Sequence, residues 1–350
     1  MKNILILVSL FTACCCGTSQ NSSETIPRID STSQSNLETT ASTYAESITV
    51  DELKKYLYTF AGDDFEGRDT GEPGQKKAAE YLKEQYKRMG IPSPLGEDDY
   101  FQEIPASYFR GGIKSSENVL AFIKGSDKAD EIVVISAHYD HVGVDYDGNI
   151  YNGADDDGSG TVSILEIAEG FMQAKKDGHG PRRSILFLHV TGEEKGLYGS
   201  KFYTENPVFP LENTVTDLNI DMIGRIDDAH DEEGKRDYIY LIGSDRLSSE
   251  LHDISEKMNK TYTQLDLDYT FNAKNDPNRF YFRSDHYNFA KHNIPIIFYF
   301  NGVHEDYHKH TDTADKIEYE LMTKRAKLVF YTAWDIANRE QRLIVDKAKK

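Results

Sequence analysis

Carboxylates and imidazoles, which are the usual protein ligands of divalent metals, gather in three short segments of this 350-residue sequence. Residues 135–143 read ISAHYDHVG, residues 152–160 read NGADDDGSG, and residues 191–200 read TGEEKGLYGS. A ligand set that joins imidazoles to carboxylates favours zinc over magnesium, and manganese or cobalt would also fit it. The three segments are therefore candidate parts of one metal site.

His138 and Asp140 form an HxD pattern at the end of an apolar run. On an extended chain, residues two apart lie on the same face, so the aspartate could accept the second ring proton and orient the imidazole toward a metal. The pattern is short and frequent, however. Taken alone, it favours an ordinary polar strand end.

The acidic run contains Asp155, Asp156 and Asp157 in succession. Three adjacent like charges repel one another unless a cation compensates them, although the following helix N-terminus and solvent could supply part of that compensation. A carboxylate that bridges two divalent ions about 3.5 to 4 Å apart is the alternative. The run therefore indicates either a solvated turn or a bridging ligand.

Glu193 and Glu194 are also adjacent. Neighbouring side chains on an extended chain point in opposite directions, so one glutamate could bind a metal while the other acts as general base on a water. Isolated glutamate pairs usually belong to a solvated surface.

Asp221 stands in the otherwise apolar segment NIDMIG, and a carboxylate in a buried strand is normally paired or bound to a metal. Near the C-terminus, His304, His308 and His310 are each a possible metal ligand. Spacing alone does not choose among these three histidines.

Apolar periodicity places these side chains on alternating strands and helices. The predicted strands are residues 131–137, 184–190, 217–222, 238–242 and 294–300. The predicted helices are residues 49–62, 75–90, 161–175, 246–260, 285–292 and 315–340. The alternation predicts an α/β fold, an αβα sandwich around a mostly parallel sheet that residues 103–124 make mixed. Residues 261–279 are polar and are expected to form an active-site loop. In such sheets, ligands lie beyond the carboxyl ends of the strands.

The formal net charge of −19 and the pI of about 5.0 argue against nucleic acid or an anionic membrane surface as partner. All three cysteines lie at positions 14–16. The folded part therefore has no disulfide and no thiolate ligand.

The N-terminal sequence predicts three regions. Residues 1–16 read as a lipoprotein-type signal peptide with a cysteine run, residues 17–47 as a disordered polar tether, and residues 48–350 as the catalytic domain. Acylation of Cys14 would make the protein an exported lipoprotein of the bacterial cell envelope, bound to a membrane only through its lipid anchor. Plain secretion with cleavage nearby is the alternative.

The chain resembles the co-catalytic zinc aminopeptidase family, which is related to the glutamate carboxypeptidase, transferrin receptor and glutaminyl cyclase proteins. The matching segments lie between residues 51 and 318, and they keep the family order. They read FEGRDTGEPGQKKAAEYL, AHYDHVG, GADDDGSG, TGEEKGLYGS, NIDMIGR, RSDHYNFA and DYHKHTDTADKI.

This resemblance implies a zinc exopeptidase-like fold and two Zn²⁺ ions per chain. One ion would bind His138 and Asp221, the other would bind Glu194 and His308, and Asp156 would bridge them. The resemblance also implies a cis peptide bond between Asp156 and Asp157.

The resemblance assigns the remaining roles as well. It makes Glu193 the general base, Asp140 the orienting partner of His138, Tyr307 a stabiliser of the oxyanion and Arg283 a contact to the substrate. The implied activity is aminopeptidase hydrolysis of peptide substrates.

Three alternatives stay open. A carboxypeptidase of the same fold would trim the other peptide end, a glutaminyl cyclase-like aminoacyltransferase would keep a single zinc site, and a receptor-like member would lack working metal sites. Five implied ligands and a base favour the peptidase. The preferred terminal residue and the oligomeric state do not follow from the sequence.

Overall fold

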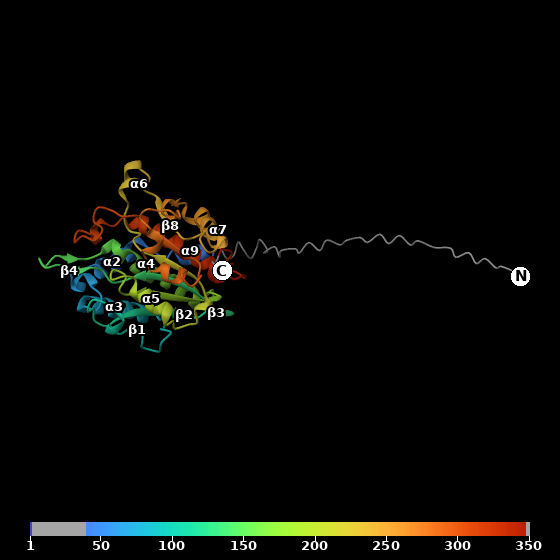
Figure 1. Cartoon of the computed structure of the whole chain (residues 1–350), viewed down its shortest axis with the longest axis horizontal. Coiled ribbons are helices and arrows are strands. Elements are labelled where there is room, and N and C mark those ends of the chain that lie inside the picture. Colours follow the sequence, from blue (N-terminus) through green and yellow to red (C-terminus); the bar gives the residue numbers. More distant parts are fainter. Residues whose placement is uncertain (2–39, 348–350) are drawn as a thin grey trace. The chain divides into compact units, whose positions relative to one another are not determined.

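A central sheet of eight strands runs through the computed structural model, which describes Met1 and residues 40–347 (Figure 1). In spatial order the strands are β1 (Phe101–Ile104), β2 (Ser116–Ile123), β6 (Arg183–Val190), β3 (Lys128–His138), β7 (Thr214–Ile220), β10 (Ile296–Phe300), β8 (Tyr238–Ile242) and β9 (Asp266–Asp268). The pairs β6–β3, β3–β7, β7–β10 and β8–β9 are parallel, and the other three are antiparallel. The predicted mixed, mostly parallel sheet is confirmed.

The three strands β6, β3 and β7 are buried over most of their length because helices cover both faces of the sheet. Ile135 of β3 is level with Phe187 of β6 and with Leu218 of β7, and all three side chains are fully buried. These buried strands therefore form the base of the site, and several of the site residues lie at or just beyond their ends.

Helices form a layer on each face of the sheet, as an αβα sandwich requires (Figure 1). The larger core cluster contains side chains of α2 (Val50–Phe60), α3 (Pro73–Met89), α4 (Gly160–Lys176), α7 (Ser249–Met258) and α9 (Tyr319–Asn338). The core cluster on the opposite face contains side chains of α5 (Tyr198–Glu205) and α8 (His286–Ala290). The short helix α6 (Asp228–Glu233) projects at the top of Figure 1, and β4 (Gly143–Val144) pairs with β5 (Ile150–Tyr151) in a small hairpin.

Residues 261–279, expected to be one loop, contain the edge strand β9 and a short helical turn, Thr270–Asn272. The strand has only three residues, and two of them are aspartates, so no periodicity marks it. It forms through parallel pairing of Asp266 with Tyr238 at the sheet edge.

The folded part begins earlier than the predicted boundary at residue 48. Residues 40–45 are helical, and Ala41, Tyr44 and Ala45 belong to the main core cluster. Tyr44 also stacks on Trp334 of α9, with ring centroids 5.8 Å apart. The end of the predicted tether is therefore part of the fold, whereas the predicted signal peptide and the tether up to residue 39 lie outside the described residues.

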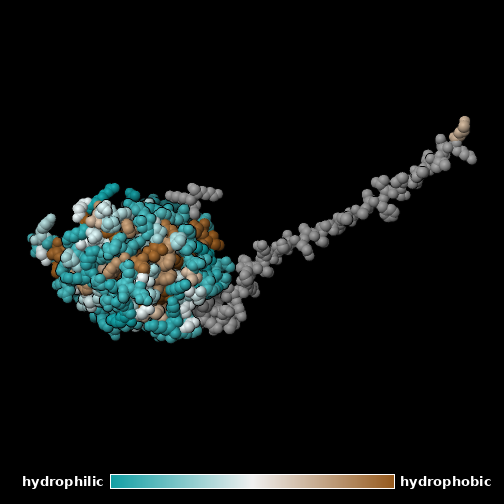
Figure 2. All heavy atoms as spheres, turned by 90° about the horizontal axis from the view of Figure 1, so that it is seen from below, coloured by the Kyte–Doolittle hydropathy of each residue, from teal (hydrophilic) through white to brown (hydrophobic). Residues whose placement is uncertain are grey.

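Most of the face in Figure 2 is hydrophilic, with apolar residues gathered near its middle. A hydrophilic exterior agrees with a sequence in which 28% of the residues are charged. Within the part of the chain that the structure describes, no helix has both the length and the apolar character needed to cross a membrane.

Candidate metal centre

The predicted site residues meet at one end of the sheet, beyond the carboxyl ends of its parallel strands. His138 is the last residue of β3, Asp221 directly follows β7, and the Glu193 and Glu194 pair follows β6 after a tight turn. Asp156 lies in the helical turn Ala154–Ser159 that leads into α4. This is the position where open α/β sheets bind ligands.

Asp156 lies at the centre of the group. Its Oδ1 is 3.2 Å from Nε2 of His138, and its Oδ2 is 3.0 Å from Nε2 of His308. The peptide bond between Asp156 and Asp157 is cis, as the family resemblance implied. One carboxylate thus presents a separate oxygen to each of two imidazoles, which is the arrangement that a bridging ligand needs.

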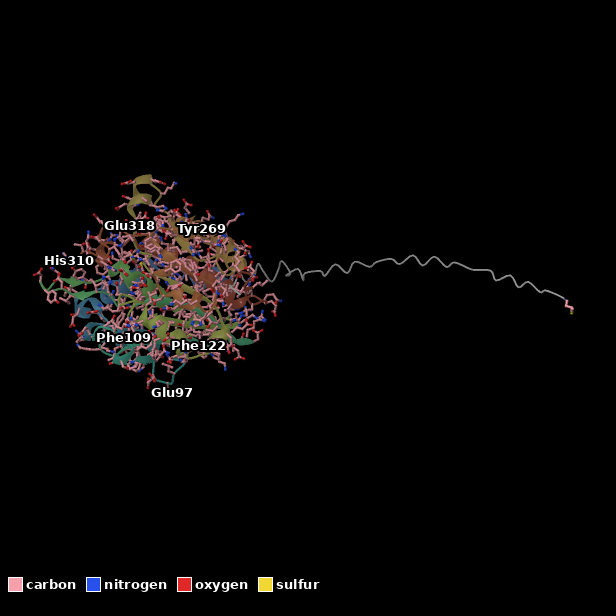
Figure 3. The ribbon with its side chains drawn as sticks, viewed as in Figure 1. Glu97, Phe109, Phe122, Tyr269, His310 and Glu318 are labelled. Carbon is pink, nitrogen blue, oxygen red and sulfur yellow. The ribbon has the colours of Figure 1, made fainter. Side chains whose placement is uncertain are left out.

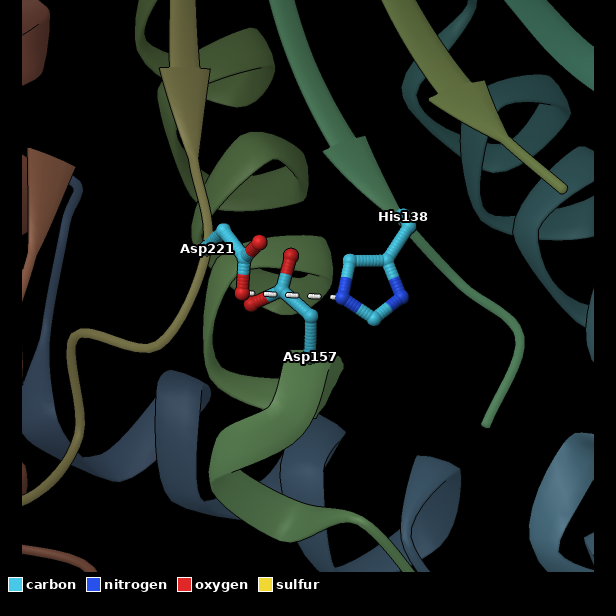
Figure 4. Close-up of side chains that lie close together, drawn as sticks. All are labelled: His138, Asp157 and Asp221. Atoms are coloured by element: carbon cyan, nitrogen blue, oxygen red, sulfur yellow. Dashed lines mark ion pairs between the residues drawn. The ribbon is translucent and has the colours of Figure 1, made fainter. Parts of the chain in front are cut away.

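The first set of candidate ligands surrounds His138, whose Nε2 is also 3.5 Å from Oδ1 of Asp221 (Figure 4). Asp157 reaches the same place from the helical turn that leads into α4. Its Oδ1 accepts hydrogen bonds from the backbone N–H groups of Met222 and Gly160, so this carboxylate fixes the loop after β7. His138, Asp157 and Asp221 are all buried.

The second set joins His308 to Glu194, with Nε2 of the histidine 3.2 Å from Oε2 of the glutamate. The Glu194 carboxylate is almost fully buried, whereas 39% of the His308 side chain is exposed to solvent. His308 has a φ of 55°, in the left-handed region that non-glycine residues rarely adopt. This backbone conformation places the imidazole over the two carboxylates.

A backbone contact determines the tautomer of His138. Its Nδ1 lies 3.0 Å from the carbonyl oxygen of Asp140 and 3.8 Å from the nearer carboxylate oxygen of that residue. Because a carbonyl oxygen only accepts hydrogen bonds, Nδ1 carries the ring proton. In the neutral imidazole, Nε2 therefore directs a lone pair at Asp156 and Asp221, which is the orientation of a metal-binding histidine.

The carboxylate of Asp140 makes its hydrogen bonds to groups other than His138. Its Oδ2 accepts a hydrogen bond from Oγ1 of Thr70 at 2.7 Å, and its Oδ1 accepts one from the backbone N–H of Glu193 at 3.2 Å. Asp140 thus contacts His138 through its backbone and holds the Glu193 backbone through its side chain.

Glu193, Arg283 and Tyr307 line a cleft beside Asp156 and Asp221. The other walls of this cleft are apolar side chains, namely Met222, Phe280, Phe298, Phe300 and Val303. The Tyr307 ring stacks on the His308 ring, with centroids 3.9 Å apart. Burial and the nearby carboxylates raise the pKa of Tyr307, so its hydroxyl remains a proton donor.

The other two candidate histidines lie outside the two sets. Nε2 of His304 is 3.1 Å from Oδ2 of Asp155, whose Oδ1 accepts a hydrogen bond from the backbone of Gly224. His310 is exposed and packs edge-on against Tyr151 of β5, at the β4 side of the domain (Figure 3).

Sequence reasoning missed three residues that shape the centre. His141 is fully buried, and its Nδ1 lies 2.9 Å from Oε1 of Glu194. Asp312 accepts hydrogen bonds from the backbone N–H groups of Asp155 and Asp156. Arg68, also fully buried, donates to the carbonyl groups of Tyr139 and Gly153. The second histidine of AHYDH was the available signal for His141, whereas Asp312 and Arg68 lie in two of the matching segments without any sign of the groups that they contact.

Unpaired buried polar atoms test whether these residues suit zinc. Among the described residues, buried atoms without a hydrogen-bond partner include Nε2 of His138, Oδ2 of Asp156, Oδ2 of Asp157, Oε1 of Glu194 and both ring nitrogens of His141. Buried polar atoms are normally paired, so their concentration here indicates a site for cations. Imidazole nitrogens and carboxylate oxygens are ligands that zinc prefers. The residues therefore fit the metal.

The electrostatics of the centre agree with this fit. Burial would lower the pKa of His308, but the carboxylates of Asp156 and Glu194 outweigh burial and raise it to about 10. The pKa of His138 is also raised, because Asp221 and Asp156 outweigh its desolvation. Both imidazoles lie in a field that favours positive charge at this position.

The family model described as peptidase family M28 matches residues 118–333, well over half of the chain. The chain belongs to peptidase family M28. This M28 peptidase is therefore a member of a zinc metallopeptidase family, which confirms the predicted resemblance and enzyme class.

Curated relatives match a limited part of the M28 peptidase. The vacuolar membrane protease of Tuber melanosporum is 35% identical over 136 residues, which are 37% of this chain and 13% of the relative. A probable zinc metalloprotease of Pyricularia oryzae is 37% identical over 110 residues, 31% of this chain and 21% of the relative. The matched region is thus a small share of these longer relatives.

Solved structures share the fold. The LapA aminopeptidase of Legionella pneumophila superposes with a TM-score of 0.67 at 23% identity, over 87% of this chain and 76% of that one. A zinc aminopeptidase of Bacillus subtilis superposes with a TM-score of 0.63 at 17% identity, over 86% of this chain and 97% of that one. A Zn-dependent exopeptidase of Parabacteroides distasonis superposes with a TM-score of 0.63 at 20% identity, over 83% of this chain and 99% of that one. These likenesses confirm the predicted zinc exopeptidase-like architecture.

One prediction is wrong by these comparisons. The N-terminal sequence predicted an exported lipoprotein of the bacterial cell envelope, whereas the curated relatives include fungal proteins named as vacuolar membrane proteases. The short apolar and cysteine-rich start on which that prediction depended lies outside the described residues.

Proposed function

We propose that this M28 peptidase removes N-terminal residues from peptides by hydrolysis, with two zinc ions in the centre described above. The observation that supports the proposal most is the position of Asp156. Its two oxygens face separate imidazoles, His138 at 3.2 Å and His308 at 3.0 Å. A carboxylate placed in this way can hold two ions side by side.

The proposed ligands are the five predicted from the sequence: His138 and Asp221 for one ion, Glu194 and His308 for the other, and Asp156 for both. When bound, two zinc ions would lower the pKa of a water molecule and polarise the scissile carbonyl group. Glu193 lies beside this position and makes no ion pair within the described residues, so it is available for proton transfer.

Residues of the chain then perform the remaining steps. Glu193 takes the proton of the attacking water and later gives it to the leaving amine, as a general base and then a general acid. Tyr307 donates its hydroxyl proton as a hydrogen bond to the oxyanion. The apolar walls formed by Phe280, Phe298 and Phe300 hold an apolar side chain of the terminal residue.

A carboxypeptidase is the second candidate, because Arg283 lies in the wall of the same cleft and could pair with a terminal carboxylate. Three carboxylates, Asp156, Glu193 and Asp221, line the cleft together with this single cation. Two bound zinc ions would offset these charges, so the aminopeptidase is preferred because the solved structures of this fold include zinc aminopeptidases.

The test compares three substrates of the same length: a peptide with both ends free, one with an acetylated amino end and one with an amidated carboxyl end. An aminopeptidase cleaves the first and third and leaves the second intact. Cleavage of the acetylated peptide alongside protection of the amidated one supports the carboxypeptidase instead. Elemental analysis of the purified enzyme should give two zinc ions per chain, and removal of zinc by a chelator should abolish turnover until zinc is restored.

A further inference from the structure

His141 is a third imidazole at the centre, and the proposed ligand set does not use it. The residue follows β3, and its backbone N–H donates to the carbonyl of Arg68 at 3.2 Å. Its ring is fully buried against Gly153, where an added Cβ would lie 2.5 Å from the ring. The ring therefore has no room to turn away from the carboxylates in front of it.

The His141 ring has the surroundings that are typical of a metal ligand. Nδ1 lies 2.9 Å from Oε1 of Glu194 and 3.8 Å from Oδ2 of Asp156, and these three atoms belong to one group that could enclose an ion. The His308 ring stands nearly perpendicular to it, with the centroids 5.7 Å apart. His141 thus faces the same two carboxylates as His308.

The contact between Nδ1 and Glu194 is not an aligned hydrogen bond. Although the two atoms are 2.9 Å apart, each counts among the buried atoms that have no hydrogen-bond partner in the described structure. Oδ2 of Asp156, which the proposed second ion would contact, has the same property. Atoms that are close together without bonding to each other converge on a common point, as ligands of one ion do. Two ligand atoms about 2.0 to 2.2 Å from a tetrahedral ion are themselves about 3.4 Å apart, and the two distances from Nδ1 lie on either side of that value.

We propose that Nδ1 of His141 is an additional ligand of the ion held by Asp156, Glu194 and His308. This inference rests on the two-zinc centre of the proposed function. The ion would then have four protein ligands, two of them imidazoles, whereas the ion at His138 has three. Because each added ligand strengthens binding, the two positions differ in affinity, and the position with His141 fills first.

The experiment measures zinc binding directly by competition with a chelator in the wild-type chain, in His141→Asn and in His141→Phe. Asparagine keeps an N–H donor near Nδ1 but lacks an imidazole, and phenylalanine keeps the ring shape without any nitrogen. His310→Asn, which changes an exposed histidine outside the centre, is the matched control. Circular dichroism checks folding, and His141→Leu replaces the Phe variant if that variant does not fold.

The expected result is that both His141 variants bind one of the two zinc ions at least 100-fold more weakly, while the other ion and the His310→Asn control are unchanged. With Co²⁺ in place of zinc, the visible absorption of the tighter position should change in both variants. A loss confined to His141→Phe, or a loss of 10- to 100-fold without a change in the cobalt spectrum, overturns the proposal and leaves His141 as a hydrogen-bonding partner of Glu194. Wild-type affinity in both variants also overturns it. If the wild-type chain binds fewer than two ions, the two-zinc function itself has failed, and the stoichiometry reports this separately.

Discussion

Glu193 and Glu194 are adjacent in sequence, yet the pKa values of their carboxyl groups are displaced in opposite directions. Desolvation raises the pKa of Glu193, and the nearby charges of Asp221 and Glu194 raise it further. Desolvation and Asp156 would also raise the pKa of Glu194, but the imidazoles of His141 and His308 outweigh them and lower it. One residue is thus suited to carry a proton and its neighbour to remain a carboxylate.

We therefore expect Glu193→Gln to reduce turnover by about 10² to 10⁴-fold or more, because it removes the proton acceptor, while two zinc ions remain bound. Glu194→Gln should instead lose zinc. Steady-state kinetics and elemental analysis on the same preparations separate the two effects. A Glu193→Gln protein that has lost metal would show that the two roles are reversed.

His308→Ala should bind the second zinc ion much more weakly, because it removes one imidazole from the proposed ligands of that ion. His310→Ala should keep both ions and nearly wild-type turnover, since the exposed His310 side chain packs against Tyr151, outside the centre. Zinc content after dialysis is the measurement. Equal zinc loss in both variants would falsify the choice of His308.

Glu166 of α4 makes the stability of the fold depend on pH. It is fully buried, and burial, followed by the charge of Glu52, raises its pKa from 4.5 to about 8. Between these two values the folded chain keeps a proton that the unfolded chain releases, so this residue makes the free energy of unfolding fall as the pH rises from about 4.5 to about 8.

Glu166→Gln should remove this dependence, because glutamine is neutral throughout and keeps an acceptor for the backbone N–H of Thr49. Relative to the wild type, the variant should gain stability as the pH rises, by at most about 5 kcal/mol at pH 8. Urea unfolding at pH 5 and pH 8 measures the gain. Glu84→Gln, at an exposed position of α3, is the control and should give no such gain. A constant difference between Glu166→Gln and wild type at both pH values would contradict the assigned pKa.

Arg68→Lys should destabilise the fold by about 2 to 4 kcal/mol, because lysine cannot reproduce the planar fork. The guanidinium group donates to the carbonyl groups of Tyr139, Asn152 and Gly153, and so ties the loop after β3 to the turn that carries Asp156. Urea unfolding measures the loss, and zinc binding should weaken as well. The exposed change Arg236→Lys should have little effect on either quantity.

The fold was predictable where hydrophobic periodicity is strong. The helix predicted at 161–175 and the strand predicted at 184–190 correspond closely to α4 and β6, because long apolar patterns specify buried elements. By contrast, β9 depends on pairing at the sheet edge, and the helical residues 40–45 depend on packing against Trp334. Such tertiary contacts leave no periodic signal in a short polar segment.

The site was predictable where a contact depends on the type of side chain. His138, Asp156, Glu194, Asp221 and His308 meet as the family resemblance implied, although their roles remain proposals. The contact of the Asp140 carbonyl with His138 was not predictable, because a backbone atom has no residue type. His141 was missed for a different reason: the sequence shows a histidine but not the direction of its ring.

The proposed ligands come from elements distributed over most of the chain, from His138 at the end of β3 to His308 beyond β10. A ribosome makes the chain from the N-terminus, so a nascent chain that ends before residue 308 has the bridging carboxylate but still lacks one proposed ligand of the second ion. Complete loading of the centre must therefore wait until synthesis has passed His308. Completion of the proposed centre is accordingly a late step in the maturation of the protein, whereas the three residues proposed for the first ion are all present once residue 221 has been made.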